Sequence, residues 1–221
     1  MKILSIDTAS NLCTVAVLEN KKCIKEIIVN DARNHSEKIM PVIEQALSES
    51  KLTLQDINLI VCDKGPGSFT GIRIGVGTVL AFQDSLNIPC IGISSLEVLA
   101  YNVSTDGLIC STIDCKNDNC YFALYELKNG NYKVLEPPTS ESISNVLDLL
   151  NSKYENKNIT FVGDGIKKNS ISNYLDSFNL GIAGFNKFIS NNKNGEEILP
   201  MYLKKPQAER QLEEKLKKLG E

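Results

Sequence analysis

Short apolar runs and alternating apolar residues predict strands in the first part of the chain. The N-terminal segment ILSIDT, residues 3–8, is such a run and ends near a carboxylate. Alternation continues at residues 13–19 and 23–29, which are separated by a polar turn at 20–22. Patterning with a period of two, interrupted by turn residues, is typical of an antiparallel meander. The chain is therefore predicted to begin with three consecutive strands.

A helical period replaces this alternation further along the chain. Apolar residues recur three and four positions apart over residues 36–50, and a second helix is predicted at about 71–86. Buried strands are predicted on either side of the second helix, at 58–62 and 88–93, and a short helix follows the latter strand. The first hundred residues are therefore predicted to run β-β-β-α-β-α-β-α.

The second half of the chain repeats the beginning of the first. The segment SIDTASNLCTVAVLE from Ser5 aligns without gaps on TIDCKNDNCYFALYE from Thr112, with five identical residues offset by 107 positions. A hairpin turn at 128–131, a helix near 140–151 and a strand at 158–163 follow in the same order as in the first half. Repetition of both sequence and element order predicts duplicated β-β-β-α-β-α units.

Each repeat places an aspartate, Asp7 or Asp114, at the end of its first strand. Two lobes that each open with strand, aspartate, turn and strand resemble the actin-like ATPase superfamily (ASKHA proteins, RNase H-like fold), whose paired aspartates face each other across a nucleotide cleft. We therefore predict an α/β protein with a first lobe at 1–104, a second, shorter lobe at 105–203 and a charged C-terminal helix at 204–221. A carboxylate after a strand can also simply accept backbone N–H groups, so both roles stay open.

The segment GPGSFTGIRIG, residues 65–75, has the form of an anion site at a loop that enters a helix. Ser68 or Thr70 could cap the helix, and Arg73 in its first turn could meet a phosphate or a carboxylate. The segment lacks both the Gly-Lys-Ser/Thr of a Walker A loop and the spacing of the dinucleotide fingerprint. It therefore predicts only a weak, vestigial nucleotide site, comprising Asp7, Gly65, Gly67, Ser68 and Asp114.

The helix that follows has small side chains. Gly75 and Gly77 lie inside it, where each costs on the order of 1 kcal/mol relative to alanine. Such glycines are expected where another backbone approaches closely, which places the partner segment either within the same lobe or in a second protein.

Composition limits the classes of function. With 24 basic and 27 acidic residues the net charge is −3, which argues against a protein that grips nucleic acid alone through a basic surface. The N-terminal apolar run is too short for a signal peptide or a membrane span, so a cytoplasmic protein without membrane contact is predicted. Seven cysteines without a C-x-x-C pair suit a reducing compartment.

Three of these cysteines, Cys110, Cys115 and Cys120, are spaced by five residues. Metal-ligand pairs normally have tighter spacing, and the surrounding run is predicted to be strand, so no metal site is predicted. The role of the three thiols stays open.

Five motifs together resemble one family. They are ILSIDTA at the N-terminus, HSEKIMPVI at 35–43, GPGSFTGIRIG at 65–75, IGISSLEVLA at 91–100 and LPMYLKK at 199–205. In order and spacing they are similar to the TsaB (YeaZ) family over nearly the whole chain. The resemblance implies a non-catalytic paralogue of TsaD, which transfers threonylcarbamoyl to the adenosine beside the anticodon in tRNAs that read codons beginning with A.

The resemblance also implies partners. A TsaB protein binds and activates TsaD through the helices at about 36–50 and 71–86, pairs with itself through the same face when alone, and is joined by the ATPase TsaE. tRNA is then bound through the complex, and ATP or ADP in or near the complex stays open as a cofactor. The interface is predicted to contain His35, Ile39, Ile43, Gly71, Ile72, Arg73, Gly75, Val76 and Val79.

Catalytic residues are not predicted. Where the transferase has a His-Leu-Glu-x-His pattern that holds its metal, this chain has Ser95 and Leu99 in place of the histidines, and its one histidine is His35. Lys116 replaces an arginine that is common in the family, which weakens any anion contact carried over to this loop. The competing prediction is an actin-like kinase or ATPase that binds ATP in its own cleft.

Overall fold

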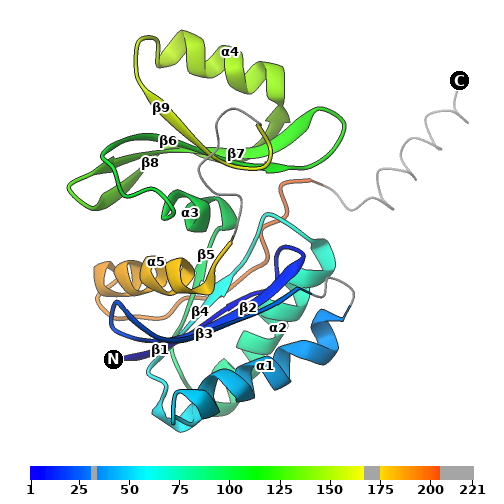
Figure 1. Cartoon of the computed structure of the whole chain (residues 1–221), viewed down its shortest axis with the longest axis vertical. Coiled ribbons are helices and arrows are strands. Elements are labelled where there is room, and N and C mark those ends of the chain that lie inside the picture. Colours follow the sequence, from blue (N-terminus) through cyan, green and yellow to red (C-terminus); the bar gives the residue numbers. More distant parts are fainter. Residues whose placement is uncertain (31–33, 167–174, 205–221) are drawn as a thin grey trace, which may run out of the picture.

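The predicted meander opens a five-stranded sheet in the computed structural model, which describes residues 1–30, 34–166 and 175–204 (Figure 1). Its strands lie in the order β3-β2-β1-β4-β5, so β1 is central, antiparallel to β2 and parallel to β4. The bounds are β1 (Lys2–Asp7), β2 (Leu12–Glu19), β3 (Lys22–Asn30), β4 (Leu59–Asp63) and β5 (Cys90–Ile93).

A four-stranded sheet repeats this topology in the second half, with the order β8-β7-β6-β9. Its strands are β6 (Gly107–Asp114), β7 (Asn119–Lys128), β8 (Asn131–Ser142) and β9 (Ile159–Gly163). Asp7 pairs with Thr14 but Asp114 pairs with Cys120, so the second hairpin is one residue shorter. The gapless alignment of the repeats is therefore displaced by one residue after the aspartate.

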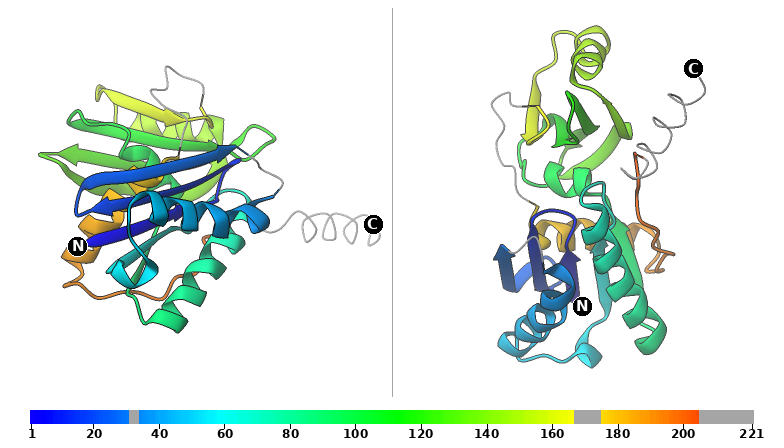
Figure 2. Two further views of the ribbon diagram at one scale, coloured as in Figure 1. Left: turned by 60° about the horizontal axis from the view of Figure 1, so that its bottom comes forward. Right: turned by 90° about the vertical axis from the view of Figure 1, so that its right-hand side faces the viewer.

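Five α-helices of the described part form layers around these sheets (Figures 1 and 2). They are α1 (His35–Glu49), α2 (Phe69–Leu86), α3 (Ser95–Ala100), α4 (Ile143–Lys153) and α5 (Ser177–Ser190), with a 3-10 turn at Leu54–Asp56. Helices α1 and α2 cover one face of the first sheet, α3 and α5 lie between the sheets, and α4 covers the outer face of the second sheet. None of these helices is both long and apolar enough to cross a bilayer.

Helix α5 follows the second sheet in sequence but packs on the first. Gly184 lies against the Val61 side chain so closely that a Cβ would overlap it, and the Ser5 hydroxyl donates to the Ser177 carbonyl at 2.5 Å. The boundary predicted at 105–203 is therefore wrong for this helix, because its apolar face completes the core of the first lobe. The predicted C-terminal helix lies outside the described residues, apart from Lys204.

Two buried carboxyl groups lie at the ends of the neighbouring parallel strands β1 and β4. Asp7 accepts a hydrogen bond from the Ala9 amide at 2.6 Å, and Asp63 accepts from the Gly65 amide and the Ser95 hydroxyl, both at 2.7 Å. Both carboxyl groups are at most 1% exposed, and the second oxygen of each has no hydrogen-bond partner in the described structure. These two residues tie the turns after β1 and β4 to the sheet.

Burial and mutual repulsion keep this pair partly protonated. Burial raises the pKa of Asp7 well above its ordinary value, and the charge of Asp63 raises it further. Burial likewise raises the pKa of Asp63 to about 7, against the opposing effect of its hydrogen bonds. The pair therefore retains a proton at pH values where an exposed aspartate is ionised.

Replacing Asp63 by asparagine should flatten the dependence of stability on pH. Because the folded pKa of Asp63 lies above its unfolded value, its contribution to stability is complete below about pH 4 and is lost as pH rises through about 7. The wild-type free energy of unfolding should fall between pH 5 and 8 by on the order of 1 to 4 kcal/mol relative to Asp63→Asn. Urea titrations across this range measure it. The exposed Asp148→Asn is the control, and an identical slope in Asp63→Asn would contradict the assignment.

Two glycines of α2 should respond to alanine in opposite directions. A Cβ at Gly71 would overlap the Thr8 carbonyl oxygen, whereas a Cβ at Gly77 meets nothing within 4 Å. Gly71→Ala should therefore lower the free energy of unfolding by about 1 to 3 kcal/mol. Gly77→Ala should raise it by up to about 1 kcal/mol, because it removes a glycine from a helix interior. Chemical denaturation compares the two, and equal effects would contradict the packing described.

Candidate functional site

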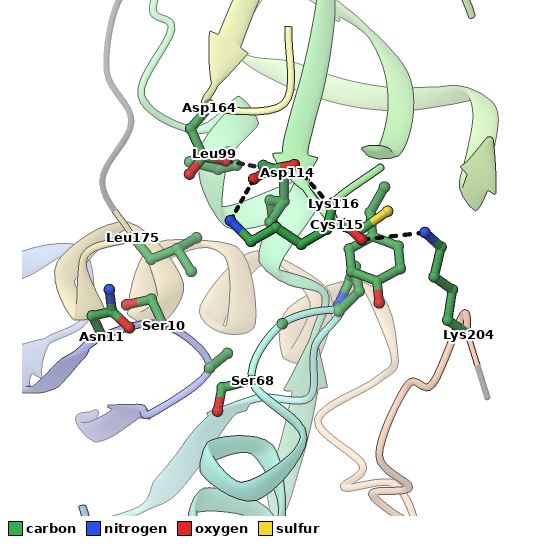
Figure 3. A pocket seen from close by; sticks show the side chains of 16 residues that line it. Ser10, Asn11, Ser68, Leu99, Asp114, Cys115, Lys116, Asp164, Leu175 and Lys204 are labelled. Atoms are coloured by element: carbon green, nitrogen blue, oxygen red, sulfur yellow. Dashed lines mark hydrogen bonds and ion pairs between the residues drawn. The ribbon is translucent and has the colours of Figure 1, made fainter. Parts of the chain in front are cut away.

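A cavity of about 390 Å³ opens between the two lobes (Figure 3). The first lobe contributes the turn after β1 and the glycine loop before α2, and the second contributes the turn after β6 and the end of β9. Leu175, just before α5, and Lys204, at the end of the described chain, complete it. The interlobe cavity is therefore formed by the segments in which the two repeats each carry an aspartate.

The wall contributed by the second lobe is charged. One oxygen of Asp114 accepts from the Lys116 amide at 2.9 Å, and the other binds the Lys116 ammonium at 2.8 Å, which raises the pKa of that lysine. Asp164 accepts from the Asp114 amide at 2.8 Å, and the Lys204 ammonium donates to the Cys115 carbonyl at 3.3 Å (Figure 3). The carboxylate of Asp114 and the ammonium of Lys116 thus compensate each other at the cavity wall.

The glycine loop on the opposite wall is used for packing. The Ser68 amide donates to the Ala9 carbonyl at 2.7 Å, and the Gly71 amide donates to the Ser68 hydroxyl at 3.2 Å. A Cβ at Gly67 would overlap the Ala9 carbonyl oxygen. The Ser68 amide, a backbone donor of the kind that faces the anion in a phosphate-binding loop, is therefore engaged with the turn after β1. The loop therefore joins α2 to β1.

The structure separates the residues predicted to bind a nucleotide. Gly67, Ser68 and Asp114 line the cavity, whereas Asp7 and Gly65 do not. Asp7 does not face Asp114 across the cavity, because it is buried beside Asp63 under the turn after β1. Of the two roles left open for Asp7, acceptance of a backbone N–H group is the one observed.

Two carboxylates near these turns were missed from the sequence. Asp63 ends β4 and Asp164 directly follows β9, so they occupy similar places in the two repeats. The segments VCDKG and VGDG carry that correspondence and could have identified both residues.

Of the nine residues in the predicted partner surface, only Arg73 is exposed. Five of its residues are at most 2% exposed and pack between the helices and the first sheet: Ile39, Ile43, Ile72, Val76 and Val79. His35 is also buried, and its Nε2 lies 3.0 Å from the Ser10 carbonyl oxygen. These side chains form the core of this chain, because the apolar stripe of each helix faces its own sheet.

The exposed sides of the same helices carry Arg73 and residues that the prediction did not include. Met40 is 50% exposed on α1, and Arg73, Gly77 and Ala81 are exposed along α2. Spaced four residues apart, these three define what we call the outer face of α2. Arg73 donates to the Tyr202 hydroxyl at 2.9 Å, and that ring stacks on Phe69 with a centroid distance of 4.0 Å.

The positions at which the resemblance expects metal-binding histidines have other contacts. Ser95 donates its hydroxyl to Asp63, and Leu99 lines the interlobe cavity. The described residues contain no group of three or more His, Cys, Asp or Glu side chains arranged to hold a metal ion.

Solved structures show the same fold. YeaZ from Pseudomonas aeruginosa superposes with a TM-score of 0.76 and 23% identity, over 91% of this chain and 99% of that chain. A Pseudomonas aeruginosa protein described as similar to the peptidase YeaZ gives a TM-score of 0.78, also with 23% identity, over 92% and 99%.

Sequence relatives define the family. The model described as TsaD, tRNA N6-adenosine threonylcarbamoyltransferase, matches residues 22–210. The tRNA threonylcarbamoyladenosine biosynthesis protein TsaB of Bacillus subtilis is 37% identical over 164 residues, 74% of this chain and 71% of that protein. TsaB of Buchnera aphidicola is 37% identical over 177 residues, 78% and 83%. Within the broader family of the transferase model, this chain belongs to the TsaB (YeaZ) family.

Proposed function

We propose that this chain is a non-catalytic subunit in the synthesis of threonylcarbamoyladenosine on tRNA, where it binds and activates a TsaD transferase. Family membership supports the pathway, since the relatives are named biosynthesis proteins of this modification. The use of the glycine loop for internal packing is the observation that carries the non-catalytic role. A loop whose Ser68 amide is bound to the Ala9 carbonyl at 2.7 Å does not offer that donor to a phosphate.

Side chains around the interlobe cavity support the same conclusion. Ser95 and Leu99 occupy the places of the transferase's metal-binding histidines, and one of them is bound to a buried carboxyl group. On the other wall, Asp114 and Lys116 neutralise each other at 2.8 Å. Among the described residues, neither wall presents an activated nucleophile beside a base, which acyl transfer to a hydroxyl or hydrolysis of a peptide would use.

The outer face of α2 is the surface that we assign to the transferase. Gly77 is exposed, and a Cβ there would meet no atom of this chain within 4 Å. A glycine in a helix interior costs on the order of 1 kcal/mol, so its presence is explained by the close approach of another backbone. Met40 on the adjacent α1 adds exposed apolar area. Two helices of the partner can pack on these two helices as a bundle.

The remaining partners in this proposal, TsaE, tRNA and a second copy of the chain, are those that the family resemblance implies. The ATPase TsaE joins the heterodimer, and tRNA is held mainly by the assembly, because this chain carries a net charge of −3. The free chain pairs with itself through the outer face of α2 and works in the cytoplasm.

Reconstitution tests the pathway. Purified TsaD, TsaE, tRNA, ATP and the threonylcarbamoyl-adenylate donor should form modified tRNA at background level without this chain and well above background with it. Mass spectrometry of digested tRNA measures the nucleoside. The chain alone with ATP and Mg²⁺ is the control for the alternative of an actin-like kinase or ATPase. Turnover of ATP without any partner, or full modification without the chain, would overturn the proposal.

A charged side chain on the outer face of α2 should separate binding from stability. Gly77→Glu removes the close approach of the partner helix, so affinity for TsaD should fall at least about 10-fold, while the folded chain keeps or gains stability. Calorimetric titration and thermal unfolding measure the two effects. Ser152→Glu, on the exposed side of α4, is the matched control. Unchanged affinity in Gly77→Glu would refute this surface.

A further inference from the structure

A second pocket of about 500 Å³ lies at the far end of α5 from the interlobe cavity. It forms where the last turns of α5 meet α3, the turn between β7 and β8, and the turn between β2 and β3. The residues that line it are separate from those of the interlobe cavity and from the outer face of α2. Its volume suits a ligand of the size of a nucleotide.

One wall of this pocket is a rigid aromatic stack. The rings of Tyr101 and Tyr132 are 4.0 Å apart between centroids and 16° from parallel. The Tyr132 hydroxyl donates to the Val103 carbonyl at 2.8 Å, and the Tyr101 hydroxyl accepts from the Asn186 side-chain amide at 3.1 Å. Because both hydroxyls are held, the ring of Tyr132 is oriented before any ligand arrives.

A carboxylate without a partner lies among the lining residues. Glu97 is half-buried, and the structure shows no hydrogen bond or ion pair from its carboxylate to any described residue. The nearby Lys187 ammonium is bound elsewhere, to the Gly92 carbonyl at 3.0 Å and to Glu196 at 2.7 Å. Burial raises the pKa of Glu97, partly opposed by the charges of Lys187 and Lys64. This carboxylate is therefore an unused acceptor that favours a ligand with N–H donors.

The pocket also has an exposed cation at its edge. Lys21 is exposed in the turn between β2 and β3, and its ammonium lies 5.6 Å from the centre of the Phe185 ring. An exposed cation–π contact is weak, so this ammonium is available to a phosphate.

From these contacts we propose that the pocket binds a guanosine monophosphate unit, either a free nucleotide or an unpaired guanosine in an RNA strand. The base stacks on Tyr132, since base–aromatic stacking is sequence-tolerant and strong. Its N1–H and amino group donate side by side to Glu97, which is the edge that distinguishes guanine from adenine. The phosphate binds Lys21.

Binding experiments on the full chain separate the two sources of this ligand. Calorimetric titrations use GMP, AMP, ribose 5-phosphate, a single-stranded RNA hexamer with one guanosine, and the same hexamer in a duplex. GMP should bind at least about 10-fold more tightly than AMP, and ribose 5-phosphate should not bind. If the single-stranded hexamer binds and the duplex does not, an unpaired guanosine in RNA is a ligand of the pocket. If GMP binds and the hexamer does not, the ligand is the free nucleotide. The proposal is overturned if neither GMP nor the hexamer binds, if AMP binds as tightly as GMP, or if the duplex binds as tightly as the single-stranded hexamer.

Substitutions locate the ligand in this pocket. Tyr132→Leu should weaken GMP binding about 10-fold, while Tyr132→Phe, which keeps the ring and loses only the hydrogen bond to Val103, should bind GMP more tightly than Tyr132→Leu does. Glu97→Gln should abolish the preference for GMP over AMP, a ratio that is measured within one variant and does not depend on its stability. Gly77→Glu lies outside this pocket and should bind GMP with the affinity of the wild type. A loss of TsaD binding in that variant therefore tests the outer face of α2 independently of the proposed GMP site. Unchanged affinity in Tyr132→Leu would refute the location.

Discussion

The contact between the glycine motif and the turn after β1 is the constraint on which the first lobe depends. The Thr8 hydroxyl donates to the Gly71 carbonyl at 2.7 Å, and the Ser68 amide donates to the Ala9 carbonyl at the same distance. Only glycine leaves room for the Thr8 carbonyl beside Gly71. This contact fixes where α2 begins and how closely its apolar side chains pack on the face of the first sheet. It also engages the Ser68 amide, so this backbone donor of the loop is used within the lobe.

Helix α5 extends this constraint to the second lobe. It leaves the second sheet, returns to the first through Gly184 and Val61, and lies between the sheets together with α3. The two lobes are therefore joined by a shared helical layer as well as by the chain itself, which enters the second lobe after α3 and returns to the first before α5. Leu175, just before α5, lines the interlobe cavity, and the last turns of α5 line the pocket of Tyr132 and Glu97.

Most of the fold could be predicted from the sequence because periodicity and duplication are local properties. The strands, the helices at about 36–50 and 71–86 and the repeated aspartates follow from patterns within a few residues. The path of α5 could not be predicted, since the choice between two apolar sheets is made by tertiary packing. The same limit explains the error in the predicted interface. Any helix that is partly buried has an apolar stripe such as Ile72, Val76 and Val79. The sequence pattern does not indicate whether that stripe packs on a sheet of the same chain or on a partner protein.

The exposed glycine of α2 carries more information about partners than this apolar stripe. A buried glycine is explained once an atom of the same chain fills the space beside it, as the Thr8 carbonyl does for Gly71. At Gly77 no such atom lies within 4 Å, yet the helix bears the same conformational cost. Because no contact within the described chain accounts for the conformational cost of Gly77, the glycine indicates a contact with another molecule. The surface of α2, rather than the cavity between the lobes, thus bears the feature that packing within the described chain leaves unexplained.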